Sequence, residues 1–262
     1  MAVIYDLPTW VIVLGVLVLS FAANELGFRF GSRKGLDETE RSRAVSNGLK
    51  ASILGLVALL LGFSYSSTSS RYYQRQRMAL DEANAIGTCY LRAGLLSLPE
   101  STSIRLHLKR YTQLRLDYFV NGLQREVMME DENAMAEELT ALWAQVEAAA
   151  DHQPDKVRLS QIVPAANSVI DLNSMRAWSV RNPLPVSILI LLAICLVVSG
   201  GIMGHSSGQV GKRFLGLWFC LNILVTLVLF VVLDFDRPRR GLIQVDHTPL
   251  VELEASMHDE PR

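Results

Sequence analysis

The 262-residue sequence contains few of the residues and motifs from which enzymes and metal sites are built. Its three cysteines, Cys89, Cys195 and Cys220, form no CxxC pair, and two lie inside apolar runs, which argues against a disulfide framework or a zinc site. The five histidines show no metal-ligand spacing, and there is no Gly-x-Ser-x-Gly, P-loop or HExxH motif. We therefore expect a protein that is not an enzyme, with no catalytic residue, no metal and no cofactor.

An excess of charge of one sign is also lacking. The formal net charge is −1, so the composition gives no indication of nucleic-acid binding, and we expect no nucleic-acid partner. Apolar residues, in contrast, are abundant: half of the chain is hydrophobic, and the mean hydropathy is +0.25. This composition is more apolar than that of most soluble domains.

The apolar residues are concentrated in four stretches, at about 7–23, 49–65, 184–204 and 214–233. Each is close to the ~20 residues that a helix needs to cross ~30 Å of hydrocarbon. The first stretch lacks the basic n-region of a signal peptide, which favours a membrane span there as well. The sequence predicts an all-α membrane protein with four spans and membrane lipids as partners.

The segment between spans two and three is long and amphipathic, which predicts a helical bundle outside the membrane. We expect a transmembrane hairpin at 1–66, the extramembrane bundle at 67–183, a second hairpin at 184–236 and a tail at 237–262. Four crossings place both termini and the bundle on one side of the membrane. The positive-inside rule does not choose that side, because about eight basic residues flank the spans on either side.

Helical periodicity recurs inside the expected bundle. One helix carries Ile104, Leu108, Tyr111, Leu114 and Tyr118 at helical spacing, with a possible interruption at Asn121-Gly122. Further helices are expected at about 130–150 and 155–180, the second with a bend at Pro164. In the tail, residues 242–245 could form a short strand, and Thr248-Pro249 is typical of a helix start.

Span two has an unusual character. No proline occurs between Ala51 and Leu98, although the apolar residues give way to serine, threonine and arginine within that interval. Small residues recur at steps of four and three along one helical face, interrupted only by Leu59. The members of this small-residue face are Gly48, Ser52, Gly55, Leu59, Gly62, Ser66 and Ser69.

Two interpretations of the small-residue face remain open. It could let another helix approach closely, because packing of small residues drives helix association in lipid. Alternatively, it could face an axis shared by identical subunits, where small and hydroxyl side chains leave room for water and ions. The pore-lining or constriction candidates are then Gly55, Leu59, Gly62, Phe63 and Ser66, with Leu59 and Phe63 as the apolar constriction.

Polar residues near the spans give further candidates. Asp81, Asn84 and Thr88 share one helical face, either as partners of bundle residues or as a polar ring at a pore vestibule. Asn222 lies within span four, where it could hydrogen-bond to a neighbouring helix or line an ion path. Three arginines follow span four and suit lipid headgroups, namely Arg237, Arg239 and Arg240. Gly200-Gly201 and Gly204 in span three are interpreted as helix-packing positions.

Specific stretches of the chain resemble known families. The run LGFSYSSTSSRYYQRQR resembles the Leu-Gly-Phe to Arg-Trp-Trp stretch of bestrophins, which are oligomeric ion channels; Leu61, Gly62, Phe63 and Arg71 match. The runs DEANAIGTCYLRAGLL and LDFDRPRRGLI are similar to a bacterial membrane-protein family described as "bestrophin-like domain". The acidic segment 130–138 does not match the bestrophin calcium-binding pattern, so calcium control is not implied.

The resemblance implies a homo-oligomer in the bacterial inner membrane whose second span lines a pore, with Phe63 in its neck and the bundle in the cytoplasm. Our leading hypothesis is an oligomeric channel for inorganic ions with a path along span two. The alternative is a non-conducting membrane sensor or scaffold whose bundle binds a ligand or partner. No output domain is recognisable in the sequence, which weakens a receptor but not a scaffold.

Overall fold

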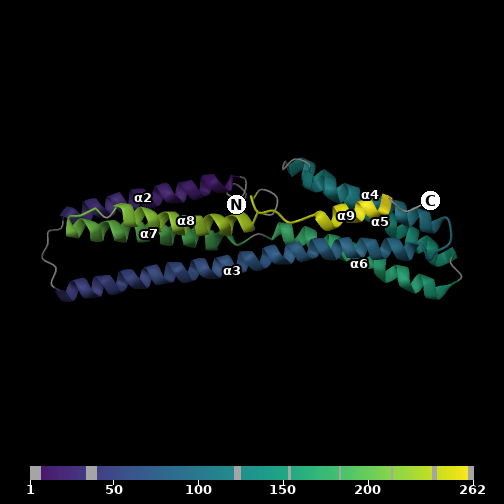
Figure 1. Ribbon diagram of the computed structural model, residues 1–262, viewed down its shortest axis with the longest axis horizontal. Helices are drawn as coiled ribbons and strands as arrows, with labels where there is room; N and C mark the ends of the chain where they lie inside the picture. Colours follow the sequence, from purple (N-terminus) through teal and green to yellow (C-terminus); the bar gives the residue numbers. More distant parts are fainter. Residues whose placement is uncertain are drawn as a thin grey trace. The chain divides into compact units, whose positions relative to one another are not determined.

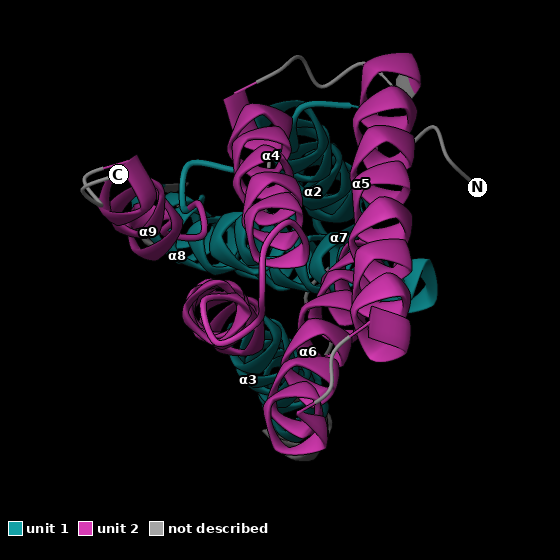
Figure 2. Ribbon diagram, turned by 90° about the vertical axis from the view of Figure 1, so that its right-hand side faces the viewer, with its two compact units in different colours: residues 1–71, 183–243 teal, residues 72–182, 244–262 magenta. Residues whose placement is uncertain are grey.

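The chain folds into helices and divides into two compact units. The computed structural model describes residues 7–33, 40–120, 125–152, 155–182, 184–213, 215–237 and 241–258. All regular structure within these ranges is helical, which confirms the all-α prediction. Unit 1 comprises residues 1–71 and 183–243, and unit 2 comprises residues 72–182 and 244–262 (Figure 2).

Unit 1 contains helices α2 (Thr9–Arg33), α7 (Val186–Val210), α8 (Leu215–Phe235) and the first part of α3 (Glu40–Ala93) (Figure 1). In the described part of the chain, four helical segments are long and apolar enough to cross a membrane, and they include these helices. Four candidate spans are therefore present, as the sequence predicts. Gly211 ends α7 with a φ of 69°, a left-handed conformation that glycine adopts without strain.

Helix α3 runs for 54 residues without interruption, although its sequence turns polar after Phe63. The hydroxyls explain why it does not end there. Ser64 Oγ donates to the Leu60 carbonyl at 2.8 Å, and Thr68 Oγ1 donates to the Ser64 carbonyl at 2.9 Å. Because each hydroxyl bonds to the preceding turn of its own helix, these residues satisfy their polar groups without help from water.

Helices α2 and α7 pack through glycines. A Cβ added to Gly204 of α7 would lie 1.9 Å from the Asn24 carbonyl oxygen of α2, and one added to Gly27 would lie 2.1 Å from the Gly201 carbonyl oxygen. No side chain fits at either position. Gly200 and Gly204 thus act as helix-packing residues, as expected, and the backbones approach closely where lipid supplies no hydrophobic drive.

Unit 2 contains the rest of α3 together with α4 (Glu100–Val120), α5 (Arg125–His152), α6 (Lys156–Arg181) and α9 (Thr248–His258). The predicted apolar positions Ile104, Leu108 and Tyr111 of α4 are fully buried in its core, as is Leu142 of α5. These residues confirm the helical periodicity.

Local signals set the starts of two helices in unit 2. The Asp155 carboxylate caps α6 by accepting the backbone N–H groups of Val157 and Arg158. Helix α9 begins at Thr248, as expected, and buries Leu250 and Met257. Helix α6 continues through Pro164, while Asn121 and Gly122 lie outside the described residues.

The short strand expected at 242–245 does not form. The backbone N–H groups of Leu242 and Ile243 donate to the Asp234 carboxylate at 2.9 and 2.8 Å. Because a nearby side chain accepts these two hydrogen bonds, the segment has no need of a partner strand.

Candidate functional site: the exposed face of helix α3 and the groups behind it

Helix α3 has one buried and one exposed face in each unit. The buried face carries Val57, Leu61, Ser64 and Thr68 in unit 1, and Ala79, Glu82, Ile86 and Cys89 in unit 2. The opposite face is exposed and carries all the pore and vestibule candidates. The other described helices thus pack against a single side of α3, and its opposite side is exposed.

The pore-lining candidates lie on the exposed face in unit 1. A Cβ added to Gly55 or Gly62 would meet no atom within 4 Å. Leu59 is 54% exposed and Phe63 is 66% exposed, and Ser66 is exposed as well. No other described helix of this chain covers these residues, so the small-residue face does not serve as a packing surface within the chain.

The vestibule candidates Asp81, Asn84 and Thr88 are exposed in unit 2. Their side chains form no hydrogen bond or ion pair with any residue that the structure describes, so they are not partners of bundle residues. Asp81 follows Phe63 by 18 residues, and Asn84 follows Ser66 by 18. About 18 residues make five turns of an α-helix, so the two sets of candidates share one helical register in the sequence.

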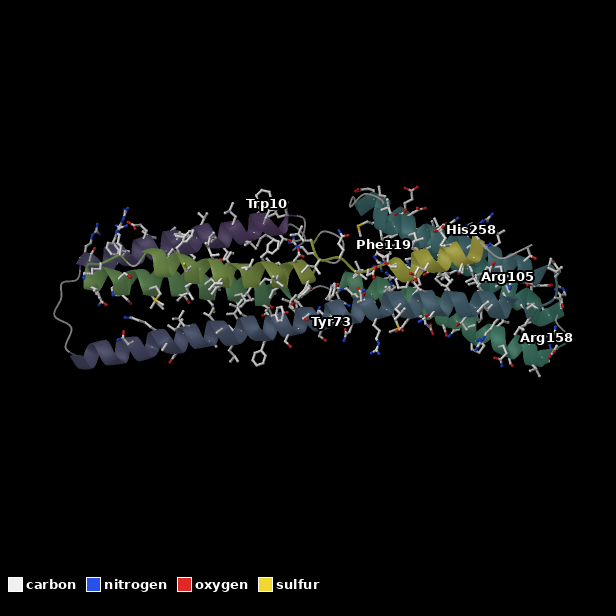
Figure 3. All side chains as sticks on the ribbon, in the orientation of Figure 1. Trp10, Tyr73, Arg105, Phe119, Arg158 and His258 are labelled. Atoms are coloured by element: carbon white, nitrogen blue, oxygen red, sulfur yellow. The ribbon has the colours of Figure 1, made fainter. Side chains whose placement is uncertain are left out.

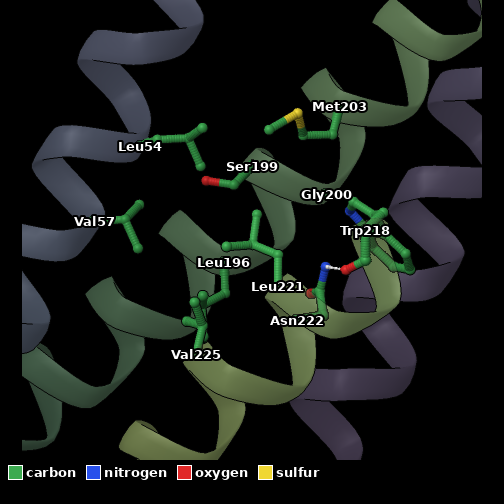
Figure 4. A pocket seen from close by; sticks show the side chains of 10 residues that line it. All are labelled: Leu54, Val57, Leu196, Ser199, Gly200, Met203, Trp218, Leu221, Asn222 and Val225. Atoms are coloured by element: carbon green, nitrogen blue, oxygen red, sulfur yellow. Dashed lines mark hydrogen bonds between the residues drawn. The ribbon is translucent and has the colours of Figure 1, made fainter. Parts of the chain in front are cut away.

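A pocket lies in unit 1 between the buried face of α3 and helices α7 and α8 (Figure 4). Its volume is about 30 Å³, and three helices form its walls. We call it the α3–α7–α8 pocket. Its lining residues are Leu54 and Val57 of α3, Leu196, Ser199, Gly200 and Met203 of α7, and Trp218, Leu221, Asn222 and Val225 of α8.

Three polar residues of unit 1, Ser20, Asn24 and Asn222, link neighbouring helices. Ser20 Oγ of α2 donates to Asn222 Oδ1 of α8 at 2.8 Å, and Asn222 Nδ2 donates to the Trp218 carbonyl at 3.1 Å. Asn24 Nδ2 donates to the Gly200 carbonyl of α7 at 3.1 Å. Asn222 therefore joins helices by hydrogen bonds, one of the two roles expected for it.

A buried charge cluster holds α3 in unit 2. Glu82 is fully buried and accepts hydrogen bonds from Arg115 of α4, at 2.9 and 3.1 Å, and from Arg176 of α6. The Tyr111 hydroxyl also donates to Glu82. Burial, together with the negative charge of Glu82, raises the pKa of Tyr111, so this phenol stays a neutral donor. The cluster fixes three helices through one carboxylate.

The chain after span four is attached to unit 2 by several contacts. Asp246 N–H donates to Gln76 Oε1 of α3 at 3.0 Å. The His247 ring stacks on Phe119 of α4, labelled in Figure 3, with ring centroids 3.5 Å apart. Burial and the nearby positive charge of Arg176 lower the pKa of His247 to about 4. The ring is therefore neutral at physiological pH.

Acidic residues at the end of α8 hold the chain together in unit 1. Both carboxylate oxygens of Asp236 accept the Leu184 backbone N–H at 2.9 Å. Arg237, expected at lipid headgroups, is instead buried, and its guanidinium donates to the Leu7 carbonyl. Arg239 and Arg240 lie outside the described residues. The described residues of the run DFDRPRRG, Asp234 to Arg237 and Gly241, thus have a structural role that the arginines alone do not indicate.

Sequence reasoning missed the partners of Glu82 but had a signal for its burial. Glu82 lies on the same face of α3 as Ile86, Cys89 and Ala93, at helical spacing, so it interrupts an apolar stripe. A charge in such a stripe indicates a buried ion pair. The residues described hold no cluster of three or more His, Cys, Asp or Glu side chains that could bind a metal ion.

Comparison with known proteins assigns the family. No curated protein and no solved structure matches the chain. The model of the family described as "Bestrophin-like domain" matches residues 14–250, which include most of the first candidate span, the other three in full and most of unit 2. The chain is thus a multi-pass membrane protein that belongs to the bestrophin-like domain family.

Proposed function

We propose that the protein is a homo-oligomeric channel for inorganic ions and that the exposed face of α3 lines its path. The observation that carries the proposal is the exposure of the small-residue face. A Cβ on Gly55 or Gly62 would meet no atom of the described residues within 4 Å, although the chain packs α2 against α7 through glycines. A glycine-rich face in a membrane span is suited to close contact with another helix or to lining a water-filled pore.

Leu59 and Phe63 form the constriction in this proposal. They are the large apolar side chains of the face, at 54% and 66% exposure, and they lie one turn apart. A ring of such side chains from several copies makes a narrow apolar passage that gates by dewetting. Ser66 follows one turn later on the same face and gives the path a polar exit.

Family membership supports the proposal, because the chain also resembles the pore helix of bestrophin channels in the run that contains Gly62 and Phe63. By the same analogy unit 2 lies in the cytoplasm and the spans cross the bacterial inner membrane.

Planar-bilayer recording of the purified protein tests the proposal. We expect a conductance that rises in the Leu59→Ser variant, because a polar side chain wets the constriction. The matched control is Leu224→Ser on α8, where the leucine is 61% exposed but lies outside the proposed path; its conductance should equal that of the unaltered protein.

Two results would contradict the proposal. One is the absence of current under every ionic gradient together with a monomer in native mass spectrometry. The other is an oligomer that passes no current even with Leu59→Ser, which would favour the non-conducting scaffold.

A further inference from the structure

The α3–α7–α8 pocket has room for water-sized molecules. Its volume is about 30 Å³, and a cavity of roughly 10–15 Å³ already holds one water molecule. The pocket therefore accommodates about two molecules of that size. All its walls belong to unit 1 and consist of residues in candidate membrane spans.

Two residues of α8 that line the pocket, Asn222 and Trp218, each keep an N–H without an acceptor. Asn222 Nδ2 donates one hydrogen bond, to the Trp218 carbonyl at 3.1 Å, and its second hydrogen has no acceptor among the residues that the structure describes. The same holds for the indole N–H of Trp218, although this side chain is only 7% exposed. Inside a membrane such donors cost free energy unless they find a partner.

Ser199 of α7 supplies the complementary group. Its hydroxyl donates to the Cys195 carbonyl at 2.7 Å, so the lone pairs of its oxygen are left to accept. No residue in the described ranges donates to them. Ser199 and Asn222 lie on different walls of the pocket, on α7 and α8 (Figure 4). A molecule between them has to accept hydrogen bonds from α8 and donate one to α7.

The lining disfavours other small molecules. None of the described residues that line the pocket is charged, so an ion would be buried there without a counter-charge, which is costly. An apolar molecule would leave the N–H groups of Asn222 and Trp218 unpaired. Water is neutral, both donates and accepts hydrogen bonds, and has the required size.

We propose that the α3–α7–α8 pocket is a water-binding site that joins α7 to α8 inside the membrane. The bound water accepts hydrogen bonds from Asn222 and Trp218 and donates one to Ser199. Ser20 already joins α2 to α8 by donating to Asn222 Oδ1 at 2.8 Å, so the water extends this hydrogen-bonded chain to a third helix. Helix α3 contributes only apolar side chains to the site, those of Leu54 and Val57.

X-ray radiolysis of the full chain in lipid nanodiscs tests the site, because hydroxyl radicals formed from a bound water attack the side chains next to it. Met203 lines the pocket, and methionine is oxidised readily to its sulfoxide. Met135 is the reference for a dry site, since it is 1% exposed in the apolar core of unit 2. A radical scavenger in the bulk solution suppresses oxidation from outside, and peptide mass spectrometry measures both oxidation rates.

We expect Met203 to be oxidised about tenfold faster than Met135, because only Met203 borders a bound water. Leu54→Phe fills the pocket and should lower the oxidation rate of Met203 to that of Met135. Ser199→Val fills the pocket from α7 and takes the place of Leu54→Phe if that variant does not fold. The matched control is Leu224→Phe, because this leucine is 61% exposed on α8 and lies outside the pocket; it should leave the oxidation rate of Met203 unchanged.

The proposal is overturned if Met203 is oxidised no faster than Met135, since the pocket is then dry. It is also overturned if Met203 is oxidised at its full rate after the pocket has been filled, because the water then lies elsewhere. The measurement requires neither current nor a particular number of subunits, so its outcome is independent of the proposed channel function.

Discussion

Gly204 of α7 faces Asn24 of α2 so closely that a Cβ on Gly204 would lie 1.9 Å from the Asn24 carbonyl oxygen. Gly62 of α3, in contrast, has no neighbour within 4 Å of an added Cβ. Both glycines lie in candidate membrane spans. The glycines of α7 therefore pack against another helix of the described chain, whereas those of α3 do not. The proposed function depends on the glycine face of α3.

The two glycines should respond differently to the same substitution. Gly204→Ala forces α2 and α7 apart and should lower the free energy of unfolding by about 1–3 kcal/mol. Gly62→Ala meets open space within the protomer and replaces a poor helix former, so its stability should be unchanged or higher. Thermal unfolding in detergent measures both. An equal loss of stability in the two variants would mean that α3 also packs within the chain.

The buried carboxylate of Glu82 should be essential for the stability of unit 2. Glu82→Gln leaves Arg115 and Arg176 buried without their counter-charge, which should cost about 3–5 kcal/mol. The adjacent, exposed Asp81 provides the matched control, and Asp81→Asn should change stability by no more than about 0.5 kcal/mol. Denaturant unfolding followed by circular dichroism distinguishes the two. Similar effects from both changes would contradict the assigned burial.

Docking of the tail should weaken in acid. The pKa of His247 is lowered from 6.5 to about 4 in the folded chain, so the undocked tail binds more protons between these values, and docking is lost as the pH falls through them. Linkage limits this loss of docking free energy to about 3 kcal/mol. Because the ring is partly exposed, solvent screening reduces the expected loss to about 1–2 kcal/mol.

The loss of tail docking can be measured by a disulfide. A Cβ on Gly87 would lie 3.1 Å from Leu253 Cδ1 of α9, so Gly87→Cys with Leu253→Cys should form a disulfide readily at pH 7. After incubation at pH 4.5 and a brief oxidation under matched conditions, the yield of this disulfide should be lower than after incubation at pH 7. His247→Phe keeps the stack on Phe119 but cannot be protonated, so its yield should not depend on this acid step. An identical acid response in that variant would exclude His247 as the cause.

The side of the membrane can be tested in unit 2 itself. Leu98 is 77% exposed between α3 and α4. In the cysteine-free chain, Leu98→Cys should resist a membrane-impermeant thiol reagent in intact spheroplasts and react after lysis, because the family analogy places unit 2 in the cytoplasm. Labelling before lysis would show that unit 2 lies outside the cytoplasm. That result would not change the proposal that the exposed face of α3 lines the path.

Much of the fold follows from local patterns in the sequence. The four spans, the uninterrupted α3 and the apolar stripe of α4 at Ile104, Leu108 and Tyr111 were predictable, because hydrophobic length and helical spacing depend on neighbouring residues alone. The exposed side of α3 was recognisable as a face, but whether the chain itself covers that face depends on where the other helices lie.

Contacts between distant residues could not be predicted. Glu82 meets Arg115 across 33 positions and Arg176 across 94, and nothing in the spacing of one helix identifies a partner on another. Asp236 likewise binds a backbone N–H 52 positions away, at Leu184. The strand expected at 242–245 was wrong for the same reason, because the carboxylate of Asp234 accepts the hydrogen bonds that a partner strand would have taken.

Two serines of α3 test the central claim most directly. Ser66 is exposed on the small-residue face, whereas Ser64 is only 5% exposed on the opposite face. In a chain from which Cys89, Cys195 and Cys220 have been removed, mild oxidation in native membranes should link Ser66→Cys copies into covalent dimers and leave Ser64→Cys copies monomeric. Monomers from Ser66→Cys, or dimers in equal yield from both variants, would contradict an oligomer built around this face of α3.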